Sequence, residues 1–328
     1  MTFIGEVTFR SVGRGQDYRQ RETGSRVGRD SILGVESVSE PEAERRDLVV
    51  NGRRVAFVQA GDGERVCVLV HGLGGCRRHW AATIPALART RRVVAVDLPG
   101  FGDSEKPRAS TIGNAVAVID ALRVSCGVER IDVVGHSLGT LVACEAAARL
   151  PQTVDRVVLA GGPITSVLAL FDAPIATLRR DPGLANFFVE AATAGLPLPA
   201  AIQALITRTP WARKLALAPY VPHPDDISEE MFGHFLAGVG APGTLSTLRQ
   251  GFGYDFTAAL TLTRPTLLIG GELDRIAPAS DLRRFAAANP AVQRVEILPG
   301  TGHLPMLERP TPFNRLVAEF LSFAPESR

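Results

Sequence analysis

The chain has 328 residues, of which 45% are hydrophobic and 21% charged, and its formal net charge is +2. This balance is typical of a protein that folds around a sizeable core, and it excludes fibrous and wholly disordered chains. Because the charge is small and no long basic run occurs, a dedicated nucleic-acid binder is also excluded. No stretch reaches the roughly 18 apolar residues of a membrane span, and the start lacks an apolar signal core, so we predict a cytoplasmic protein without a transmembrane segment.

The first 47 residues are predicted to form a flexible N-terminal extension. The segment from Arg10 to Asp47 is rich in Arg, Glu, Ser and Gly and almost lacks aromatic residues, so it cannot bury enough surface to offset the entropy lost on ordering. Acidic residues interrupt the basic ones, which weighs against a partner-binding arm or an organellar transit peptide. We therefore expect residues 1–47 to be dispensable for folding.

Ordered structure is predicted to begin at Leu48 with a β-hairpin, because Asn51-Gly52 separates two apolar runs. Beyond the hairpin, short apolar runs alternate with segments of helical spacing. This alternation predicts an α/β fold, with a mostly parallel sheet covered by helices on both faces. The later predicted strands are residues 66–70, 93–96, 131–134, 154–160, 266–269 and 292–298, and the predicted helices are residues 78–90, 111–126, 138–150, 279–288 and 312–323.

A long insertion interrupts the alternation between two core strands that a single helix would ordinarily join. Prolines separate short apolar helices there, and we interpret residues 163–256 as a helical lid. The predicted core is therefore residues 48–162 together with residues 257–328. Part of the apolar surface of the lid is expected to cover the substrate pocket. The apolar lid residues are Phe171, Leu178, Phe187, Phe188, Leu205, Ile206, Trp211, Leu215 and Leu217.

The run Gly135-His136-Ser137-Leu138-Gly139 carries the strongest chemical signal in the sequence. It directly follows a predicted strand and directly precedes a predicted helix, which is the context of a nucleophile elbow. In such a turn, glycines keep Cβ atoms out of a cramped space and the serine projects from the carboxyl edge of the sheet. We predict that Ser137 is the nucleophile.

A serine hydroxyl needs an adjacent base, and His303 is the predicted one. Among six histidines, it lies on a glycine-bordered loop between the last predicted strand and the last predicted helix. An orienting carboxylate is expected between serine and histidine in the chain, just past a strand. Asp274 meets this requirement and Glu272 is its rival. We favour Asp274 because a carboxylate farther beyond the strand tip has room to turn back toward the imidazole.

Two backbone N–H groups are expected to bind the oxyanion that forms during the reaction. One belongs to Leu138, the residue after the nucleophile, and the other to Leu73 in the glycine loop 71–75. This loop lacks the glycine spacing of a dinucleotide site, and we predict no cofactor. No histidine pair has the spacing of a zinc site, so no metal is predicted.

The remaining histidines, cysteines and tryptophans are expected to be structural. His71 and His136 should orient the backbone of the two turns. The other histidines should be local caps or surface groups, namely His79, His223 and His234. The four cysteines have no paired spacing and are expected to be mostly small core residues in a reducing compartment. Trp80 and Trp211 are expected to pack in the core or the lid.

With these motifs in order, the chain resembles the α/β-hydrolase family from about Leu48 to its C-terminal helix. The resemblance rests on five segments, namely residues 71–75, 97–104, 135–139, 271–274 and 302–310. It implies the α/β-hydrolase fold with a lid insertion. Within the family, haloalkane dehalogenases and epoxide hydrolases carry aspartate at the position of Ser137, and carbon–carbon bond hydrolases usually have Gly-Asn-Ser-Met-Gly at the elbow. These reactions are therefore less favoured.

The residues and the resemblance together predict a serine hydrolase that cleaves the carboxylic ester of an apolar small molecule through an acyl-enzyme. The same groups could act on a thioester, a lactone or a carbon–carbon bond, or could transfer the acyl group. An alternative from another class is a ligand-binding receptor of this fold without catalysis.

Overall fold

The computed structural model describes residues 43–106, 112–163, 165–180, 184–195, 197–251, 254–257 and 260–322. Within them, eight strands form one sheet in the order β1-β2-β4-β3-β5-β6-β7-β8. The strands are β1 (Glu44–Val50), β2 (Arg53–Ala60), β3 (Val66–Val70), β4 (Arg92–Val96), β5 (Ile131–His136), β6 (Val154–Ala160), β7 (Thr266–Gly271) and β8 (Val292–Leu298). β2 is antiparallel to β1 and β4, and β3 to β8 run parallel. The predicted α/β class and mostly parallel sheet are confirmed.

The N-terminal hairpin forms as predicted, but its first strand begins earlier. Asn51 and Gly52 both have positive φ, 51° and 72°, as the tight turn between twisted strands requires. β1 begins at Glu44, four residues before the predicted start, because residues 44–47 pair with β2 through the backbone. These residues are mostly charged and exposed, so they carry no apolar pattern. The rest of the predicted extension, residues 1–42, lies outside the described residues.

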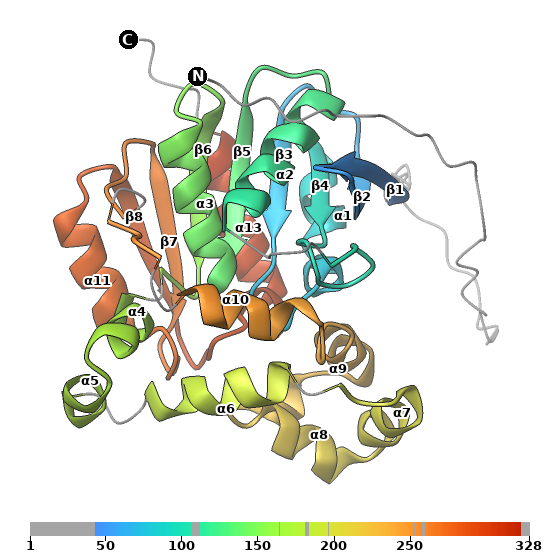
Figure 1. Cartoon of the computed structure of the whole chain (residues 1–328), viewed down its shortest axis with the longest axis vertical. Coiled ribbons are helices and arrows are strands. Elements are labelled where there is room, and N and C mark those ends of the chain that lie inside the picture. The colour runs from blue at the N-terminus through green and yellow to red at the C-terminus, as the bar shows by residue number, and fades with distance from the viewer. Residues whose placement is uncertain are drawn as a thin grey trace, which may run out of the picture.

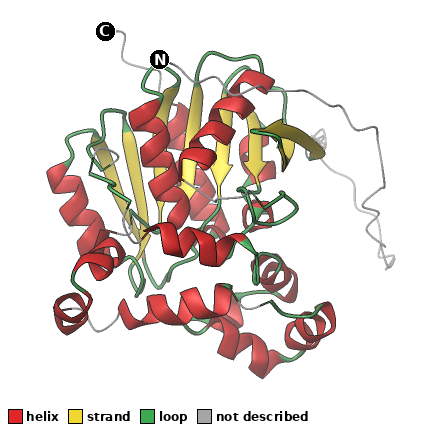
Figure 2. Ribbon diagram, viewed as in Figure 1, coloured by secondary structure: helices red, strands yellow, loops and turns green. Residues whose placement is uncertain are grey.

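Helices cover both faces of the sheet (Figure 2). Figure 1 shows α2 and α3 on one face and α1 and α13 on the other, and α11 packs against β7 and β8. The helices of the core are η1 (Arg77–Trp80), α1 (Ile84–Ala88), α2 (Ile112–Ser125), α3 (Leu138–Arg149), α11 (Ala279–Ala288), α12 (Pro305–Glu308) and α13 (Pro310–Ser322). β3 and β5 are buried along their whole length, which explains their uninterrupted apolar runs.

One predicted helix is broken in the structure. Residues 78–90 form η1 and the short α1 instead of one helix. Pro85 stands in the first turn of α1, where its missing N–H is tolerated, but it could not continue a helix from the preceding turn.

The chain between β6 and β7 is helical. It contains α4 (Thr165–Asp172), α5 (Pro174–Arg180), α6 (Ala185–Ala194), α7 (Ala200–Arg208), α8 (Pro210–Leu217), η3 (Pro224–Asp226), α9 (Glu229–Leu236) and α10 (Gly243–Gly251). Figure 1 places α5 to α8 beyond the carboxyl ends of the parallel strands. Within the described ranges, no helix is long and apolar enough to cross a bilayer.

Candidate active site

Ser137 occupies the sharp turn between β5 and α3. Its backbone has φ 50° and ψ −117°, a conformation that residues with a Cβ rarely adopt and that is typical of strained functional turns. Its N–H donates to the carbonyl of Ala160 at the end of β6, with an N···O distance of 2.9 Å. Ser137 therefore lies at the carboxyl edge of the sheet, at the start of α3.

The two glycines of the elbow are required by close backbone contacts. A Cβ added to Gly135 would lie 2.2 Å from the carbonyl oxygen of Gly139. A Cβ added to Gly139 would lie 2.3 Å from the carbonyl oxygen of Val70, at the end of β3. Neither contact can be relieved by moving a flexible side chain, so this turn can pack against β3 only with glycine at both positions.

His303 and Asp274 form a buried hydrogen-bonded pair. Nδ1 of His303 lies 2.9 Å from Oδ2 of Asp274, and the two residues are 1% and 5% exposed. The other carboxylate oxygen, Oδ1, accepts the N–H groups of Ile276 and Ala277 at 2.8 and 2.9 Å. Because a carboxylate accepts hydrogen bonds, this contact places the ring proton on Nδ1. Nε2 is then unprotonated and can accept a proton.

The rival carboxylate, Glu272, does not contact the imidazole in this arrangement. Its side chain is exposed and accepts the N–H of Gly300 at 3.0 Å. The structure thus brings Asp274, and not Glu272, to His303.

The histidine loop packs directly on the serine elbow. His136, the residue before the serine, directs Nε2 to the carbonyl oxygen of His303 at 2.8 Å, and the two rings are 5.0 Å apart. Gly161, next to the carbonyl that binds the serine N–H, also contacts this loop. A Cβ on Gly161 would lie 3.3 Å from two atoms of the His303 ring. The two loops therefore share one edge of the sheet.

The glycine loop that contains Leu73 lies against the nucleophile. A Cβ on Gly72 would lie 2.9 Å from the Cβ of Ser137, and the N–H of Gly75 closes a tight turn onto the carbonyl of Gly72 at 3.1 Å. On the other side, Leu138 is the first residue of α3, so its N–H has no acceptor within the helix. The predicted donor Leu138 thus follows the serine directly, and the loop of the predicted donor Leu73 touches it.

His71 and His136 hold backbone groups, as predicted. Nδ1 of His71 contacts the carbonyl of Gly72 at 2.8 Å, and its Nε2 accepts the N–H of Leu98 at 3.0 Å. This pair of bonds requires a neutral ring protonated on Nδ1. Burial lowers the pKa of His71, and it lowers the pKa of His136 well below its ordinary value. Both rings are therefore neutral.

The prediction that His79 is a surface group or a local cap is wrong. The residue is 4% exposed and its Nε2 lies 3.2 Å from the carbonyl of Phe235 in α9, 156 positions away in the chain. Burial lowers the pKa of His79 to about 4. The neutral ring thus joins η1, which follows the glycine loop, to the helical insertion.

The cysteines are buried or partly buried and free. Burial raises the pKa of the Cys76 thiol to about 11, which removes the thiolate that a reactive cysteine needs. Within the described ranges, no group of three His, Cys, Asp or Glu side chains could hold a metal ion.

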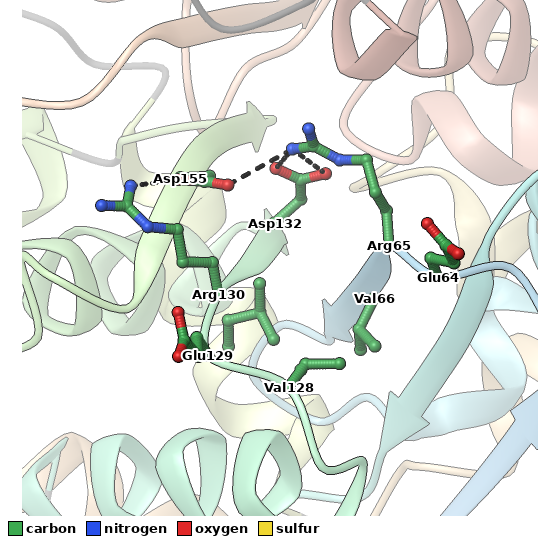
Figure 3. Close-up of a pocket in the computed structure, with 9 residues that line it drawn as sticks. Glu64, Arg65, Val66, Val128, Glu129, Arg130, Asp132 and Asp155 are labelled. Carbon is green, nitrogen blue, oxygen red and sulfur yellow. Dashed lines mark hydrogen bonds and ion pairs between the residues drawn. The ribbon is translucent and has the colours of Figure 1, made fainter.

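The pocket in Figure 3 lies at the opposite edge of the sheet, at the starts of β3, β5 and β6, and has a volume of about 360 Å³. Arg65 contacts Asp132 at 3.2 Å and Asp155 at 3.4 Å. Arg130 contacts Asp155 at 2.6 Å, and Arg91 contacts Asp132 at 2.9 Å. Because these charges pair with one another, we interpret the cluster as a tie between strand starts rather than as part of the serine site.

The apolar residues of the insertion differ in their surroundings. Among those named in the sequence analysis, Phe187 and Leu217 are buried, at 5% and 1% exposure, whereas four are exposed to solvent. The exposed four are Phe188, Leu205, Trp211 and Leu215. The expectation that Trp211 packs in the core or the lid is wrong, since it is 70% exposed, whereas Trp80 is fully buried. The side chain of Phe171 lies outside the described residues.

Comparisons with known proteins identify the family of the chain. The model of the α/β-hydrolase fold family matches residues 66–310. The chain is 32% identical over 304 residues to an uncharacterized protein of Mycobacterium tuberculosis, which covers 89% of this chain and 84% of the relative. It is 34% identical over 152 residues to a 2-hydroxymuconate semialdehyde hydrolase of a Pseudomonas species, which covers 41% of this chain and 52% of the relative.

A solved structure of a thermophilic esterase from Thermogutta terrifontis has a TM-score of 0.61 at 22% identity, covering 85% of this chain and 98% of the esterase. At that identity the likeness concerns the fold. The family match extends over most of the chain, and the relatives include hydrolases, which supports an enzyme. The chain belongs to the α/β-hydrolase fold family.

Proposed function

We propose that the chain is a serine hydrolase that cleaves the carboxylic ester of an apolar small molecule through an acyl-enzyme. The observation that carries this proposal is the buried pair of His303 and Asp274, with Nδ1 and Oδ2 2.9 Å apart. Its loop packs on the strained turn of Ser137. A base that is oriented by a third group beside a hydroxyl is the arrangement that activates a serine.

In the acylation step, Oγ of Ser137 attacks the ester carbonyl carbon while Nε2 of His303 removes its proton. The carbonyl oxygen becomes an oxyanion, which the N–H groups of Leu73 and Leu138 bind. The carbon–oxygen bond to the alcohol then breaks, and the imidazolium returns its proton to the leaving oxygen. Asp274 keeps the imidazole in the required tautomer and stabilises its positive charge.

In the deacylation step, water replaces the serine as the attacking group. His303 accepts a proton from the water, the same two N–H groups bind the second oxyanion, and Ser137 leaves with the proton that His303 returns. The products are the acid and the free enzyme. We propose no metal or cofactor for these reaction steps, because each proton and each developing charge is assigned to a residue of the chain.

We also propose that the insertion, residues 163–256, is a lid that shapes the acyl site. A Cβ added to Gly74 would lie 2.5 Å from the Cβ of Ala194, at the end of α6. Gly238 approaches the same loop, since a Cβ there would lie 2.3 Å from the carbonyl oxygen of Gly74. The insertion therefore touches the loop of the proposed oxyanion donor. An apolar wall supplied by α6, which includes the buried Phe187, would favour apolar acyl groups.

Cleavage of a carbon–carbon bond is the second candidate. It is favoured by the likeness to a 2-hydroxymuconate semialdehyde hydrolase, although that alignment covers 41% of this chain. The elbow of this chain has His136 and Leu138 around the serine, whereas those enzymes usually have asparagine and methionine. We therefore rank the ester first.

The test is a turnover screen with the purified full chain. Esters of graded acyl length, thioesters, lactones and a ring-cleavage product would be assayed side by side, with Ser137→Ala as the control. We expect ester hydrolysis that disappears in Ser137→Ala. Preferred turnover of the ring-cleavage product would favour the second candidate. Tight binding of ligands without turnover of any substrate would favour a receptor.

A further inference from the structure

The carboxylate of Glu308 bridges the backbone N–H groups of the two residues next to His303 in the chain. Its Oε2 accepts the N–H of Gly302 at 2.8 Å and its Oε1 accepts the N–H of Leu304 at 2.9 Å. Glu308 is 8% exposed. A buried carboxylate that uses both oxygens on backbone N–H groups fixes the path of those groups more firmly than neutral acceptors do.

The N–H and the carbonyl of His303 itself are bound by two other elements. Its N–H donates to the carbonyl of Tyr220 in the insertion at 2.8 Å, and its carbonyl accepts from Nε2 of His136 at 2.8 Å. The histidine loop is thus held by α12, by the insertion and by the residue next to the serine. Of these three partners, Glu308 is the one that can carry a negative charge.

The charge of Glu308 acts on the catalytic pair proposed above. Burial raises the pKa of the Glu308 carboxyl, the two N–H bonds oppose this rise, and the negative charge of Asp274 adds to it. A positive charge on His303 lowers the pKa of Glu308. Because the interaction of two charges is mutual, an ionised Glu308 favours the protonated imidazole.

Other titratable groups contact His303 or lie on the element that packs against α12. Asp274 and His136 also contact His303. The packing of η1 against α12 brings further charged groups near, but Arg77 pairs with Asp97 and His79 bonds to the carbonyl of Phe235.

We propose that Glu308 is a positioning residue for His303, which holds the two amides that flank the histidine and sets a second negative charge beside the imidazole. This inference rests on the proposed function, in which His303 becomes an imidazolium when it removes the serine proton. The carboxylate then stabilises that imidazolium together with Asp274, and it prevents the ring from drifting away from Ser137. A displacement of the order of 1 Å is enough to slow a reaction about a hundredfold.

Two substitutions separate the tether from the charge. Glu308→Gln removes the charge and leaves one oxygen to accept one of the two amides. Glu308→Asp keeps the charge, but its side chain is one methylene shorter and does not reach both amides. Glu319→Gln is the matched control, since Glu319 is an exposed residue of α13 that pairs with Arg294 of β8 and Arg315 of α13.

Two measurements are made on the wild type and on each variant, always with the full chain. The first is the titration midpoint of the His303 ring by NMR, assigned from the signal that His303→Gln loses. The second is the rate constant for labelling of Ser137 by a fluorophosphonate. For Glu308→Gln we expect a midpoint lower by about half a unit to one pH unit and labelling slowed roughly tenfold to a hundredfold. For Glu308→Asp we expect an unchanged midpoint and slowed labelling, and for Glu319→Gln no change in either.

A wild-type midpoint together with a wild-type labelling rate in Glu308→Gln would overturn the inference. If that variant does not fold, Glu308→Asp decides, because unchanged labelling there would exclude the tether. A wild-type chain that the probe does not label at Ser137 would refute the proposed function instead. In that case, the NMR midpoints would still decide the role of Glu308.

Discussion

Replacing Asp274 by asparagine should remove most activity by reversing the tautomer of His303. In the structure, Oδ1 of Asp274 accepts two N–H groups, at 2.8 and 2.9 Å, and Oδ2 faces Nδ1 of the histidine. The carbonyl oxygen of asparagine can take only one of these places. If it faces Ile276 and Ala277, both backbone bonds survive, whereas the opposite orientation would set an NH₂ group against two donors. The amide NH₂ of the variant should therefore point to the imidazole.

An NH₂ donor facing Nδ1 forces the imidazole proton onto Nε2, and Nε2 can then no longer remove the serine proton. By analogy with known triads, kcat should fall roughly 10³-fold to 10⁴-fold, or about 4 to 5 kcal/mol of transition-state stabilisation. Both backbone bonds remain, so the melting temperature should change little. The assay is kcat with a soluble p-nitrophenyl ester at pH 8.

Glu272→Gln is the matched control, because it makes the same chemical change in the same loop at a carboxylate that binds the N–H of Gly300 and not the imidazole. Its exposed side chain accepts the N–H of Gly300, so kcat should stay within about threefold of wild type. If Glu272→Gln proved the more damaging variant, or if both variants kept wild-type kcat, the assignment of Asp274 would be refuted.

Three further predictions concern stability and specificity. Because the pKa of His79 lies at about 4, below its ordinary value of 6.5, the unfolded chain takes up the proton first as pH falls. Stability is thus lost as the pH falls from 6.5 to 4, and in His79→Gln this loss of unfolding free energy should be smaller by up to about 3 kcal/mol. Denaturant titrations at several pH values measure it, and an equal loss in the variant and the wild type would contradict this. A chain that begins at Ala43 should keep its melting temperature, whereas one that begins at Leu48 should lose several degrees, since it lacks residues 44–47 of β1; equal melting temperatures would count against the role of those pairs. Phe187→Ala should raise KM for longer acyl chains by about fourfold per methylene that loses contact, and more than for acetate esters, whereas the exposed Phe188→Ala should not; equal changes for all chain lengths would make Phe187 a packing residue.

Those features that are local in the sequence could be predicted from it. The elbow is one example, because strand, serine turn and helix follow one another directly and the contact that requires Gly135 lies within the turn itself. The tight turn at Asn51 and Gly52 is another, since the two residues that adopt positive φ are the same two that indicate a turn in the sequence. Parallel strands that are buried on both faces can also be predicted, because they appear in the sequence as uninterrupted apolar runs.

Features that depend on a distant partner could not be predicted. The first residues of β1 are charged and owe their structure to pairing with β2. His79 is buried because α9 covers it, and no nearby residue signals this. Conversely, Trp211 is of a residue type that is usually buried, but in the fold its side chain is exposed to solvent. For Glu308, the sequence shows a carboxylate five residues after His303, but the two backbone bonds appear only when the loop and α12 are folded together.

The most direct test of the central claim is to locate the residue that a fluorophosphonate modifies. The full chain would be treated with the probe, and its intact mass and peptide map would be measured by mass spectrometry beside Ser137→Ala. We predict a single adduct on Ser137 that is absent from the variant and slowed in Asp274→Asn. An adduct on another residue, or the same labelling in Ser137→Ala, would contradict the account of Ser137 as the nucleophile.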